Sequence, residues 1–329
     1  MKEKLKVALY GLYGHQLHRS LNDSENAEIV AVCGLGSFFT NEIRQTFGEG
    51  VKEYSSLCEM LKDENIELVS LCSPDRSKQA DEAIMCLKAG KHVYAEKPAA
   101  YTEEDLDRIL AVSRESKREF HEMADSVFEE PYWSARKAVR EGKIGKVVQV
   151  YVQKSYPLNV DSRPQNEYKD GGLIRQVGIH AIRFLEHITG LSVEKVNVFQ
   201  THLGNIDENA GLFTASSWNM TLSNGGVASA CVNYLNPNGF ISRGNESIRI
   251  FGTEGMLEIT DGGKHTHIYT QNADEGELDL YKSDCPDFFD LLAMHLKEGK
   301  KMPMTLDEEL HPLRVCIRAY ESAKVTEKI

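Results

Sequence analysis

A histidine with polar neighbours at helical spacing is the first candidate for chemistry in this sequence. The stretch GGLIRQVGIHAIRF places Gln176, His180 and Arg183 at i, i+4 and i+7, so one helix face would carry all three. An imidazole suits proton transfer near neutral pH, and a neighbouring carboxylate would stabilise the imidazolium that forms. Gln176 can orient the ring but cannot supply that charge. We therefore predict that His180 is a weaker base than an imidazole with a carboxylate neighbour would be. Alternatively, His180 and Gln176 are hydrogen-bonded packing residues.

A glycine-containing turn follows the first apolar segment. A dinucleotide site has G-x-G-x-x-G at this point, because glycines let backbone amides approach a pyrophosphate at a helix N-terminus. Here the turn contains Gly11, Leu12, Tyr13 and Gly14, and Tyr13 stands where the second glycine belongs if Gly11 is the first. A structural turn and a phosphate-binding loop therefore both remain open.

The end of the second apolar segment also departs from the usual pattern. NAD enzymes have Asp or Glu there to bond the adenosine ribose, whereas this chain has Gly34. No Lys or Arg lies between Gly34 and Thr40, so the usual clamp for the 2'-phosphate of NADP is missing as well. The position does not separate NAD from NADP, and we expect one of the two, with NAD slightly favoured.

Other histidines and the cysteines do not form a recognisable metal or disulfide pattern. His15 and His18 have no third ligand nearby and are expected to line the turn. His265 and His267, in HTH, lack carboxylate or cysteine neighbours and are expected on a solvent-facing strand. The seven cysteines are scattered singly, without a C-x-x-C pair, which is typical of buried thiols in a reducing compartment. We predict no metal site.

Strand-like and helix-like segments alternate over the first 120 residues. KVALY, EIVAVC, ELVSLCS and HVYAEK are typical of buried strands, and a short helix is expected after the glycine turn. RSKQADEAIMCLKAG and TEEDLDRILAVSRESK are typical of helices, the first ending at Gly90 and the second opening at Thr102. This alternation predicts a parallel sheet with ligands at the carboxyl ends of its strands.

The pattern changes after about residue 145. Strand-like segments such as KVVQVYVQKSY, LFTASSWNMTL and GVASACVNYL dominate, interrupted by one helical segment, LIRQVGIHAIRFLEHITG. We predict an α/β protein with a first domain over residues 1–122 and a second, α+β domain over residues 123–304. A closing helix over residues 305–325 is expected to pack back on the first domain.

Composition narrows the class of protein. The 329 residues are 41% hydrophobic and 27% charged, which is typical of a folded protein of two domains. The formal net charge of -12 disfavours binding to nucleic acid or to an anionic membrane surface. The N-terminal apolar segment is too short for a signal-peptide core or a membrane span, so a cytoplasmic protein is expected.

One segment resembles a known family closely. AGKHVYAEKPAAYTEEDLDRIL is similar to the A-G-K-H-V-x-x-E-K-P hallmark of the Gfo/Idh/MocA family, and CSPDRSKQADEAIMCLKAGKHV extends the match. RIFGTEGMLEI and LRVCIRAYESAK match the family's second domain and closing helix. The resemblance implies a Rossmann domain followed by an open mixed sheet that often forms dimer or tetramer interfaces.

The resemblance also implies site residues. Lys97 would reach the substrate oxygen and the nicotinamide ring, Glu96 of the same motif would belong to the cofactor site, and Ser73 and Pro74 would lie beside the nicotinamide ribose. Pro98 fixes the backbone that holds Lys97 at the sheet edge. The family's histidine in this stretch is absent, with Lys78 or Gln79 nearby.

The second domain departs from the family's G-G-G-x-x-x-D-x-G-x-H-x-x-D pattern. His180 is retained and Gly178 would permit close approach to the cofactor, but Gln176 and Arg183 replace the acidic positions. A guanidinium at position 183, helped by Arg163, would favour an anionic substrate. Alternatively, Arg183 pairs with Glu186 or Glu167 at the surface.

The function implied by the resemblance is hydride transfer between NAD or NADP and a secondary alcohol or ketone of a sugar, cyclitol or sugar acid. Lys97 would polarise the oxygen and His180 would relay the proton. Two alternatives remain: a sensor or regulator of the same fold without catalysis, and an enzyme that oxidises a sugar transiently to cleave a glycosidic bond. A homodimer or homotetramer through the second-domain sheet is also expected.

Overall fold

The computed structural model describes residues 3–123, 125–158, 163–205, 211–278 and 285–325. Its contacts divide the chain into two compact units. The first unit combines Met1–Ala124 with Asp287–Leu306, and the second combines Asp125–Pro286 with Asp307–Ile329. The first boundary lies close to the predicted one, but residues 287–304, assigned above to the second domain, have their contacts with the first unit.

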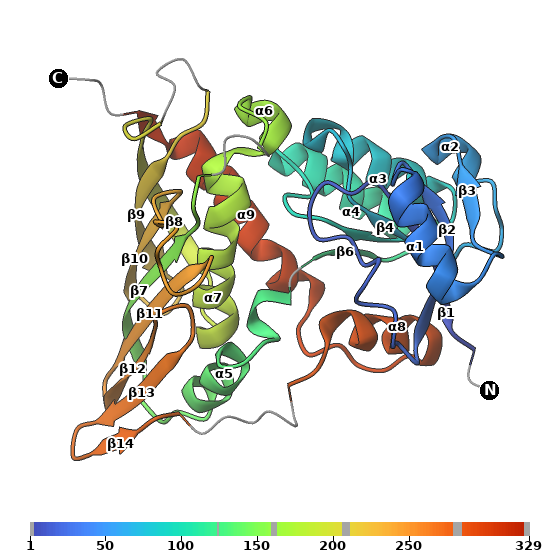
Figure 1. Cartoon of the computed structure of the whole chain (residues 1–329). Helices are drawn as coiled ribbons and strands as arrows, with labels where there is room; N and C mark the ends of the chain where they lie inside the picture. The colour runs from blue at the N-terminus through green and yellow to red at the C-terminus, as the bar shows by residue number, and fades with distance from the viewer. Residues whose placement is uncertain (1–2, 124, 159–162, 206–210, 279–284, 326–329) are drawn as a thin grey trace. The chain divides into compact units, whose positions relative to one another are not determined.

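The first unit is built on a six-stranded parallel sheet in the order β3-β2-β1-β4-β5-β6 (Figure 1). This order is that of a Rossmann fold, as expected, and it places the carboxyl ends of β1, β2, β4 and β5 along one edge. The central strands are buried on both faces, which explains their continuous apolar sequences. The strands are β1 (Leu5–Tyr10), β2 (Ala27–Cys33), β3 (Lys52–Tyr54), β4 (Leu68–Leu71), β5 (His92–Ala95) and β6 (Phe120–Glu122).

The helices of the first unit follow the predicted alternation from β2 onward. The Thr102 hydroxyl accepts a hydrogen bond from the Asp105 amide and begins α4, and Gly90, at φ +77°, follows the end of α3. The helical elements are α1 (Ser37–Phe47), α2 (Leu57–Met60), the short turn η1 (Arg76–Lys78), α3 (Gln79–Lys88), α4 (Glu103–Ser116) and α8 (Phe288–Glu298). Sequence analysis did not predict α8, which buries Phe288 and Phe289 against Tyr94 of β5.

The short helix expected after the glycine turn does not form. Residues 11–26 follow β1 as a succession of turns, with amide-to-carbonyl bonds from Leu21 to Leu17 and from Ser24 to Leu21. Leu17 and Leu21 are the two buried leucines of this stretch, and Asn22, Asp23 and Ser24 follow them directly. Two apolar anchors followed by turn-forming residues sustain one turn and not an amphipathic helix.

The second unit is built on a nine-stranded mixed sheet in the order β14-β13-β12-β11-β7-β10-β9-β8-β15. β7 pairs in parallel with β10 and antiparallel with β11, so the two halves of the sheet join at β7. The strands are β7 (Val147–Ser155), β8 (Val193–Thr201), β9 (Ala215–Leu222), β10 (Val227–Asn233), β11 (Asn245–Gly252), β12 (Gly255–Thr260), β13 (His265–Thr270), β14 (Asp274–Gly276) and β15 (Lys324–Val325). The mostly antiparallel, mixed sheet confirms the predicted class of the second domain.

Helices lie on one face of this sheet (Figure 1). They are α5 (Tyr132–Arg140), α7 (Ile179–Thr189) and α9 (Leu306–Ser322), and the shorter elements η2 (Asp125–Val127), α6 (Glu167–Asp170) and the π-helical turn η3 (Ile174–Gly178) complete the unit. The contacts of the closing helix α9 place it in the second unit, and its packing on the first unit stays a prediction.

The strand register brings exposed apolar side chains to one face of the same sheet. Tyr269 lies opposite Met256, Met256 opposite Phe251, Phe251 opposite Gln149, and Gln149 opposite Val227. Phe251, Tyr269 and Val227 are 37%, 39% and 48% exposed. The row crosses five neighbouring strands, β13, β12, β11, β7 and β10, and the polar Gln149 lies in it between Phe251 and Val227.

Candidate functional site

Gly11 directly follows β1, where the backbone after the neighbouring strand β4 comes close. It adopts φ +69°, and a Cβ at this position would lie 2.1 Å from the carbonyl oxygen of Cys72, just after β4. The same Cβ would meet Pro74 at 3.3 Å and Gly34 lies nearby, so three of the predicted loops converge on Gly11. The structure therefore requires glycine here for packing at the sheet edge.

Gly14 makes room for the carboxyl group of Glu96. It adopts φ +121°, and a Cβ would lie 2.6 Å from the Glu96 side chain. Glu96 is 1% exposed, and its Oε2 accepts a hydrogen bond of 2.8 Å from the His15 amide. Burial alone would raise the pKa of Glu96, but the charges of His15, Lys97 and Arg76 and the hydrogen bond from His15 lower that pKa to about 2. The glycine turn is thus tied to the E-K-P segment by an ionised carboxylate.

Lys97 follows β5 directly and is largely buried. Its side chain is 8% exposed, and Nζ lies 3.8 Å from Oε1 of Glu96. The backbone on both sides of Lys97 is held by Gln79, whose Nε2 donates to the carbonyl oxygens of Glu96 and Pro98, the latter at 3.0 Å. Lys97 therefore stands on a backbone segment fixed by side-chain hydrogen bonds.

Gln79 is a residue whose importance sequence reasoning missed. It is fully buried, and its Oε1 accepts hydrogen bonds from the Ser73 amide at 3.2 Å and from Arg76. Lys78, the other candidate near the family's missing histidine, is 69% exposed at its side chain. In the family pattern T-P-x-x-x-H-x-x-x-A-x-x-A-L-x-A-G-K-H-V, counting forward from Pro74 puts the histidine position at Lys78. Counting back from AGKHV puts it at Gln79, the buried residue.

Arg76 was missed as well. It is 2% exposed, donates to the carbonyl oxygen of Tyr13 and to Gln79, and lies with its guanidinium 5.1 Å from the centre of the Tyr13 ring. Tyr13, which replaces a glycine of the usual loop, thus has a packing partner. Beside it, Leu12 is half-buried, Ser73 is buried and Pro74 is exposed.

The end of β2 is open. Gly34 is exposed at φ +74°, and a Cβ there would meet nothing closer than 3.8 Å. Helix α1 follows with Gly36 as its N-cap, no capping side chain and no acidic residue in its first turn. A dinucleotide fits these residues: glycine-dependent loops and a buried lysine lie along the carboxyl edge, with the open N-terminus of α1 beside Gly34. The usual helix after β1 is missing.

His180 lies in the first turn of α7, in the second unit. Its Nδ1 lies 2.8 Å from the hydroxyl oxygen of Ser126, in η2. The ring of Tyr156 stands edge-on to the imidazole at 6.4 Å between centres. Burial raises the pKa of Tyr156 to about 12, so this neighbour is uncharged at neutral pH. Sequence analysis did not single out Ser126.

The turn before His180 is not α-helical as predicted. Residues Ile174–Gly178 form a π-helical turn, whose wider i→i+5 hydrogen bonding means that α-helical spacing does not relate Gln176 to His180. Gln176 is buried, and its Nε2 donates to the Asp170 carbonyl oxygen at 2.5 Å. A Cβ at Gly178 would lie 2.6 Å from the Trp218 ring, so the glycine is required by close packing within this unit.

The two arginines have different surroundings. Arg163 donates to both carboxylate oxygens of Asp170 at 3.1 Å and to the Tyr234 hydroxyl at 2.7 Å. Asp170 is fully buried, so the charge of Arg163 is compensated within the chain. Arg183 is fully buried, which contradicts the alternative of a surface ion pair with Glu186 or Glu167. Glu186 pairs with His311 at 2.9 Å.

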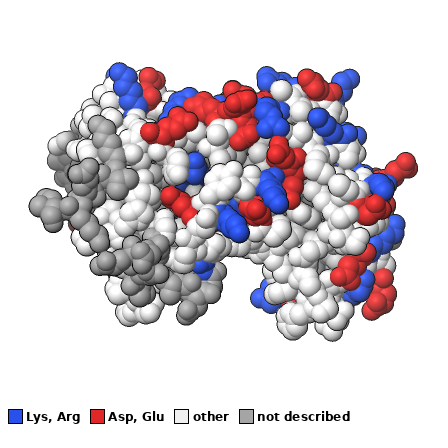
Figure 2. All heavy atoms as spheres, turned by 90° about the horizontal axis from the view of Figure 1, so that it is seen from above, with Lys and Arg blue, Asp and Glu red and all other residues white. Residues whose placement is uncertain are grey.

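The remaining histidines add no metal site. Among the described residues, no group of three His, Cys, Asp or Glu side chains is placed to hold a metal ion. His15 pairs with Glu96. On β13, His265 is exposed and pairs with Asp261 at 3.5 Å, and His267 pairs with Asp274, so the expectation that these two histidines lack carboxylate neighbours was wrong. The described helices include none that is long and apolar enough to cross a membrane. On the face shown in Figure 2, acidic and basic side chains are interspersed.

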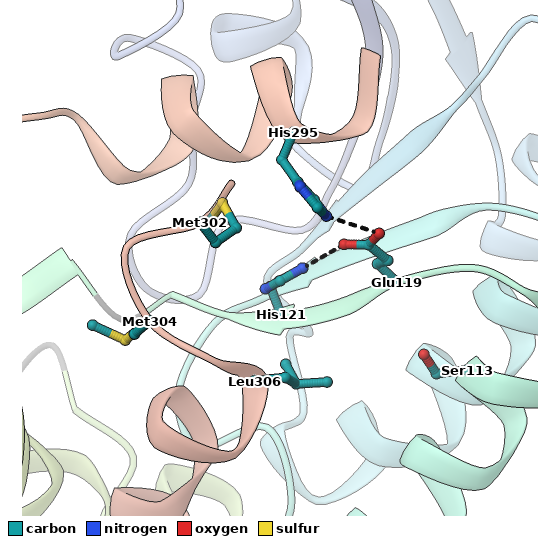
Figure 3. A pocket seen from close by; sticks show the side chains of 7 residues that line it. All are labelled: Ser113, Glu119, His121, His295, Met302, Met304 and Leu306. Atoms are coloured by element: carbon teal, nitrogen blue, oxygen red, sulfur yellow. Dashed lines mark hydrogen bonds and ion pairs between the residues drawn. The ribbon is translucent and has the colours of Figure 1, made fainter. Parts of the chain in front are cut away.

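A cavity of about 290 Å³ in the first unit lies apart from the predicted residues (Figure 3). Glu119 accepts hydrogen bonds there from His121 at 3.0 Å and from His295 at 3.1 Å. The hydrogen bond from His121 and the charges of both histidines outweigh burial and lower the pKa of Glu119 to about 2. Glu119 precedes β6, so this cavity is at the amino ends of the strands and does not belong to the predicted site. It is lined by Ser113, Glu119, His121, His295, Met302, Met304 and Leu306.

Both units match models of one protein family. The model described as an oxidoreductase family with an NAD-binding Rossmann fold matches residues 5–123, and the model of the GFO/IDH/MocA C-terminal domain matches residues 132–258. The chain belongs to this family. The resemblance noted from the E-K-P segment is therefore confirmed, as is the fold that it implied.

Individual relatives are distant. The inositol 2-dehydrogenase of Salmonella typhimurium is 25% identical over 201 residues, covering 60% of this chain and 58% of the relative. The 2,7-anhydro-N-acetylneuraminate hydratase of Escherichia coli is 25% identical over 313 residues, covering 90% of this chain and 80% of the relative. A proposed oxidoreductase from Thermotoga maritima has a solved structure with a TM-score of 0.86 at 24% identity, covering 97% of each chain. This chain thus spans less than two thirds of the inositol dehydrogenase that it matches.

Proposed function

We propose that the protein is an NAD(P)-dependent oxidoreductase that acts on a secondary alcohol or ketone of a sugar, cyclitol or sugar acid. The observation that carries the proposal is the setting of Lys97. Lys97 is largely buried, and its backbone is held by Gln79 at the carboxyl edge of a Rossmann sheet. Ligands bind at this edge in such sheets, so the lysine is placed to contact a bound ligand. Family membership and an inositol dehydrogenase among the relatives support the same reaction class.

In this proposal the chain's own residues handle the oxygen and its proton. When bound, the nicotinamide accepts or donates the hydride. Lys97 polarises the substrate oxygen through its ammonium group, and His180 takes the hydroxyl proton in oxidation or returns it in reduction. Within the family pattern, Gln176 cannot supply the carboxylate that would stabilise the imidazolium, so we expect slow oxidation.

The cofactor would be held by the loops at the carboxyl edge of the first sheet. We assign cofactor binding to the glycine turn, to the open end of β2, and to the segments after β4 and β5. The residues are Gly11, Leu12, Tyr13, Gly14, Gly34, Ser73, Pro74, Glu96 and Lys97. An uncapped α1 without acidic residues in its first turn tolerates a phosphate beside Gly34, so both NAD and NADP should be tested.

The substrate would be bound in the second unit by Gln176, Arg163 and Arg183. Because Asp170 and Tyr234 hold the Arg163 guanidinium, that side chain offers a fixed set of hydrogen-bond donors with little excess charge. This favours hydroxyl groups over a carboxylate or phosphate as its ligand. If Arg183 nevertheless selects acidic substrates, Arg183→Ala should change the ratio of affinities for sugar acids and neutral sugars.

We also propose a cytoplasmic homo-oligomer that pairs through the second-unit sheet. The row formed by Phe251, Tyr269 and Val227 is an exposed apolar strip of the kind that oligomer interfaces bury. Sedimentation of the intact protein tests the assembly, and Phe251→Glu should shift it to monomers.

The function is tested with Lys97→Ala and a matched control, Lys78→Ala, which removes an exposed lysine near the same edge. Calorimetric titration with NAD(H) and NADP(H), followed by a screen of cyclitols, sugars and sugar acids, should show binding by all three proteins and turnover by the wild type and the control. Turnover by Lys97→Ala would refute the assignment.

The same titration separates the alternatives. A folded wild type that binds neither cofactor would support a sensor or regulator. Transient redox chemistry would be supported if the protein retained NAD tightly and formed product without net cofactor consumption. The hydratase among the relatives is the reason to include this test.

A further inference from the structure

The contact between η2 and α7 suggests how this chain manages without the carboxylate that the family pattern places at position 176. Ser126 and His180 are 54 residues apart in sequence, yet Oγ of the serine lies 2.8 Å from Nδ1 of the imidazole. The serine is 9% exposed, so water competes little for the contact. Gln176 meanwhile directs its Nε2 to the Asp170 carbonyl oxygen.

The segment that carries Ser126 is firmly anchored. Val127 is fully buried and Phe128 is 6% exposed, and the Phe128 ring stacks on Trp133 of α5 at 5.4 Å between centres. On the other side of the contact, His180 is fixed in the first turn of α7. A hydroxyl and an imidazole placed on two packed elements hold one ring orientation at little cost in side-chain entropy.

We propose that Ser126 is the positioning residue for His180: its hydroxyl oxygen accepts a hydrogen bond from Nδ1–H and leaves the Nε2 lone pair to take the substrate proton. The inference rests on the proposed function and deepens it. In oxidation the proton moves from the substrate hydroxyl to Nε2, giving an imidazolium that donates through Nδ1 to Ser126. In reduction the same imidazolium returns the Nε2 proton to the carbonyl oxygen, and the ring ends with its remaining proton on Nδ1.

A neutral acceptor should stabilise the imidazolium less than a carboxylate would, because a carboxylate also places a full opposite charge beside the ring. The polar groups around this pair belong to several elements. Charged groups that act on the neutral Tyr156 are Asp125 on η2, Glu129, Arg163 and Arg243, and the Lys154 ammonium of β7 lies over its ring. Arg183 follows His180 by three residues on α7. Lys154 is itself paired with Glu246.

Three substitutions at one position separate positioning from structure. Ser126→Ala removes the acceptor and should lower kcat about 10-fold, with KM and cofactor affinity within about twofold, since it touches neither ligand. Ser126→Thr keeps the hydroxyl and should restore most of the rate. Ser126→Asp should move the acidic limb of the oxidation profile upward by about one pH unit, because imidazolium is stabilised and the free base forms only at higher pH. Ser134→Ala, which removes a buried hydroxyl bonded to Glu130, is the matched control and should leave the profile unchanged.

The deciding measurement does not depend on turnover. Nitrogen-15 NMR of histidine-labelled protein, with His180→Gln to assign the signals, reports which ring nitrogen carries the proton. We expect Nδ1–H in the neutral wild type and a shift toward Nε2–H in Ser126→Ala. A wild type with Nε2–H, or a tautomer that Ser126→Ala leaves unchanged, overturns the inference even in an active enzyme. Loss of all activity and cofactor binding in the wild type would instead overturn the proposed function, with the NMR result still deciding the contact.

Discussion

Replacing Gln79 by leucine should destabilise the first unit far more than its loss of one polar side chain suggests. Leucine nearly fills the same volume, so the change removes hydrogen bonds without opening a large cavity. Gln79 bonds the Ser73 amide and the carbonyl oxygens of Glu96 and Pro98, all beside a fully buried side chain. Each buried backbone group left without its partner costs about 1–3 kcal/mol. Three such groups, allowing for partial relaxation, predict a loss of about 3–5 kcal/mol in the free energy of unfolding.

Urea unfolding followed by far-ultraviolet circular dichroism measures this loss, with Lys78→Ala as the control. The control removes an exposed side chain and should change stability by less than about 0.5 kcal/mol. Because Gln79 holds the backbone on both sides of Lys97, we also expect Gln79→Leu to lower kcat at saturating cofactor. A loss of less than about 1 kcal/mol, with kcat unchanged, would refute the view that Gln79 fixes the E-K-P segment.

Two further changes test the second unit. Gly178→Ala would place a Cβ 2.6 Å from the buried Trp218 ring, and we expect it to lower the free energy of unfolding by about 1–3 kcal/mol with a change in tryptophan fluorescence; equal or higher stability would contradict the packing argument. Burial raises the pKa of Glu167 to about 7, opposed by Arg175 and reinforced by Asp170, so its ionisation should destabilise the fold as pH rises from about 4.5 to 7. Between pH 5 and pH 8, the free energy of unfolding of Glu167→Gln should therefore rise by about 1–2 kcal/mol relative to that of the wild type, after allowance for partial exposure. Two curves of unfolding free energy against pH that run parallel would rule this out.

The sequence predicted the features that repeat along the chain. Apolar strands alternating with capped helices predicted the parallel sheet, and the family motif implied the Rossmann fold and placed Lys97 at the carboxyl edge of that sheet. The missing helix after β1 was not foreseen, because a glycine turn is compatible with either outcome. Only two buried leucines follow that turn, which is the local property that decides against the helix.

The site contacts were harder to predict, because they join residues far apart in sequence. Ser126 meets His180 across 54 positions, and nothing in ADSVFEEP marks the serine as different from any turn residue. The π-helical turn could not be predicted either. Over five residues, the spacing of apolar side chains does not distinguish an i→i+5 turn from an α-helical one. Arg183 was placed at a helix face without any indication that this face would be fully buried.

Two of the departures from the family pattern are matched by local contacts, and this is an argument about function. Tyr13, which stands where the second glycine belongs if Gly11 is the first, meets Arg76. Gln79, one of the two residues near the position of the family's histidine, holds the backbone around Lys97. Burying an ionised Glu96 and a Lys97 side chain costs folding free energy. At a site without a function, we would expect substitutions to remove these charges or to leave them without polar partners. Their retention, in a loop remodelled to accommodate them, favours a chain that still binds a ligand at this edge over a fold that has lost its site.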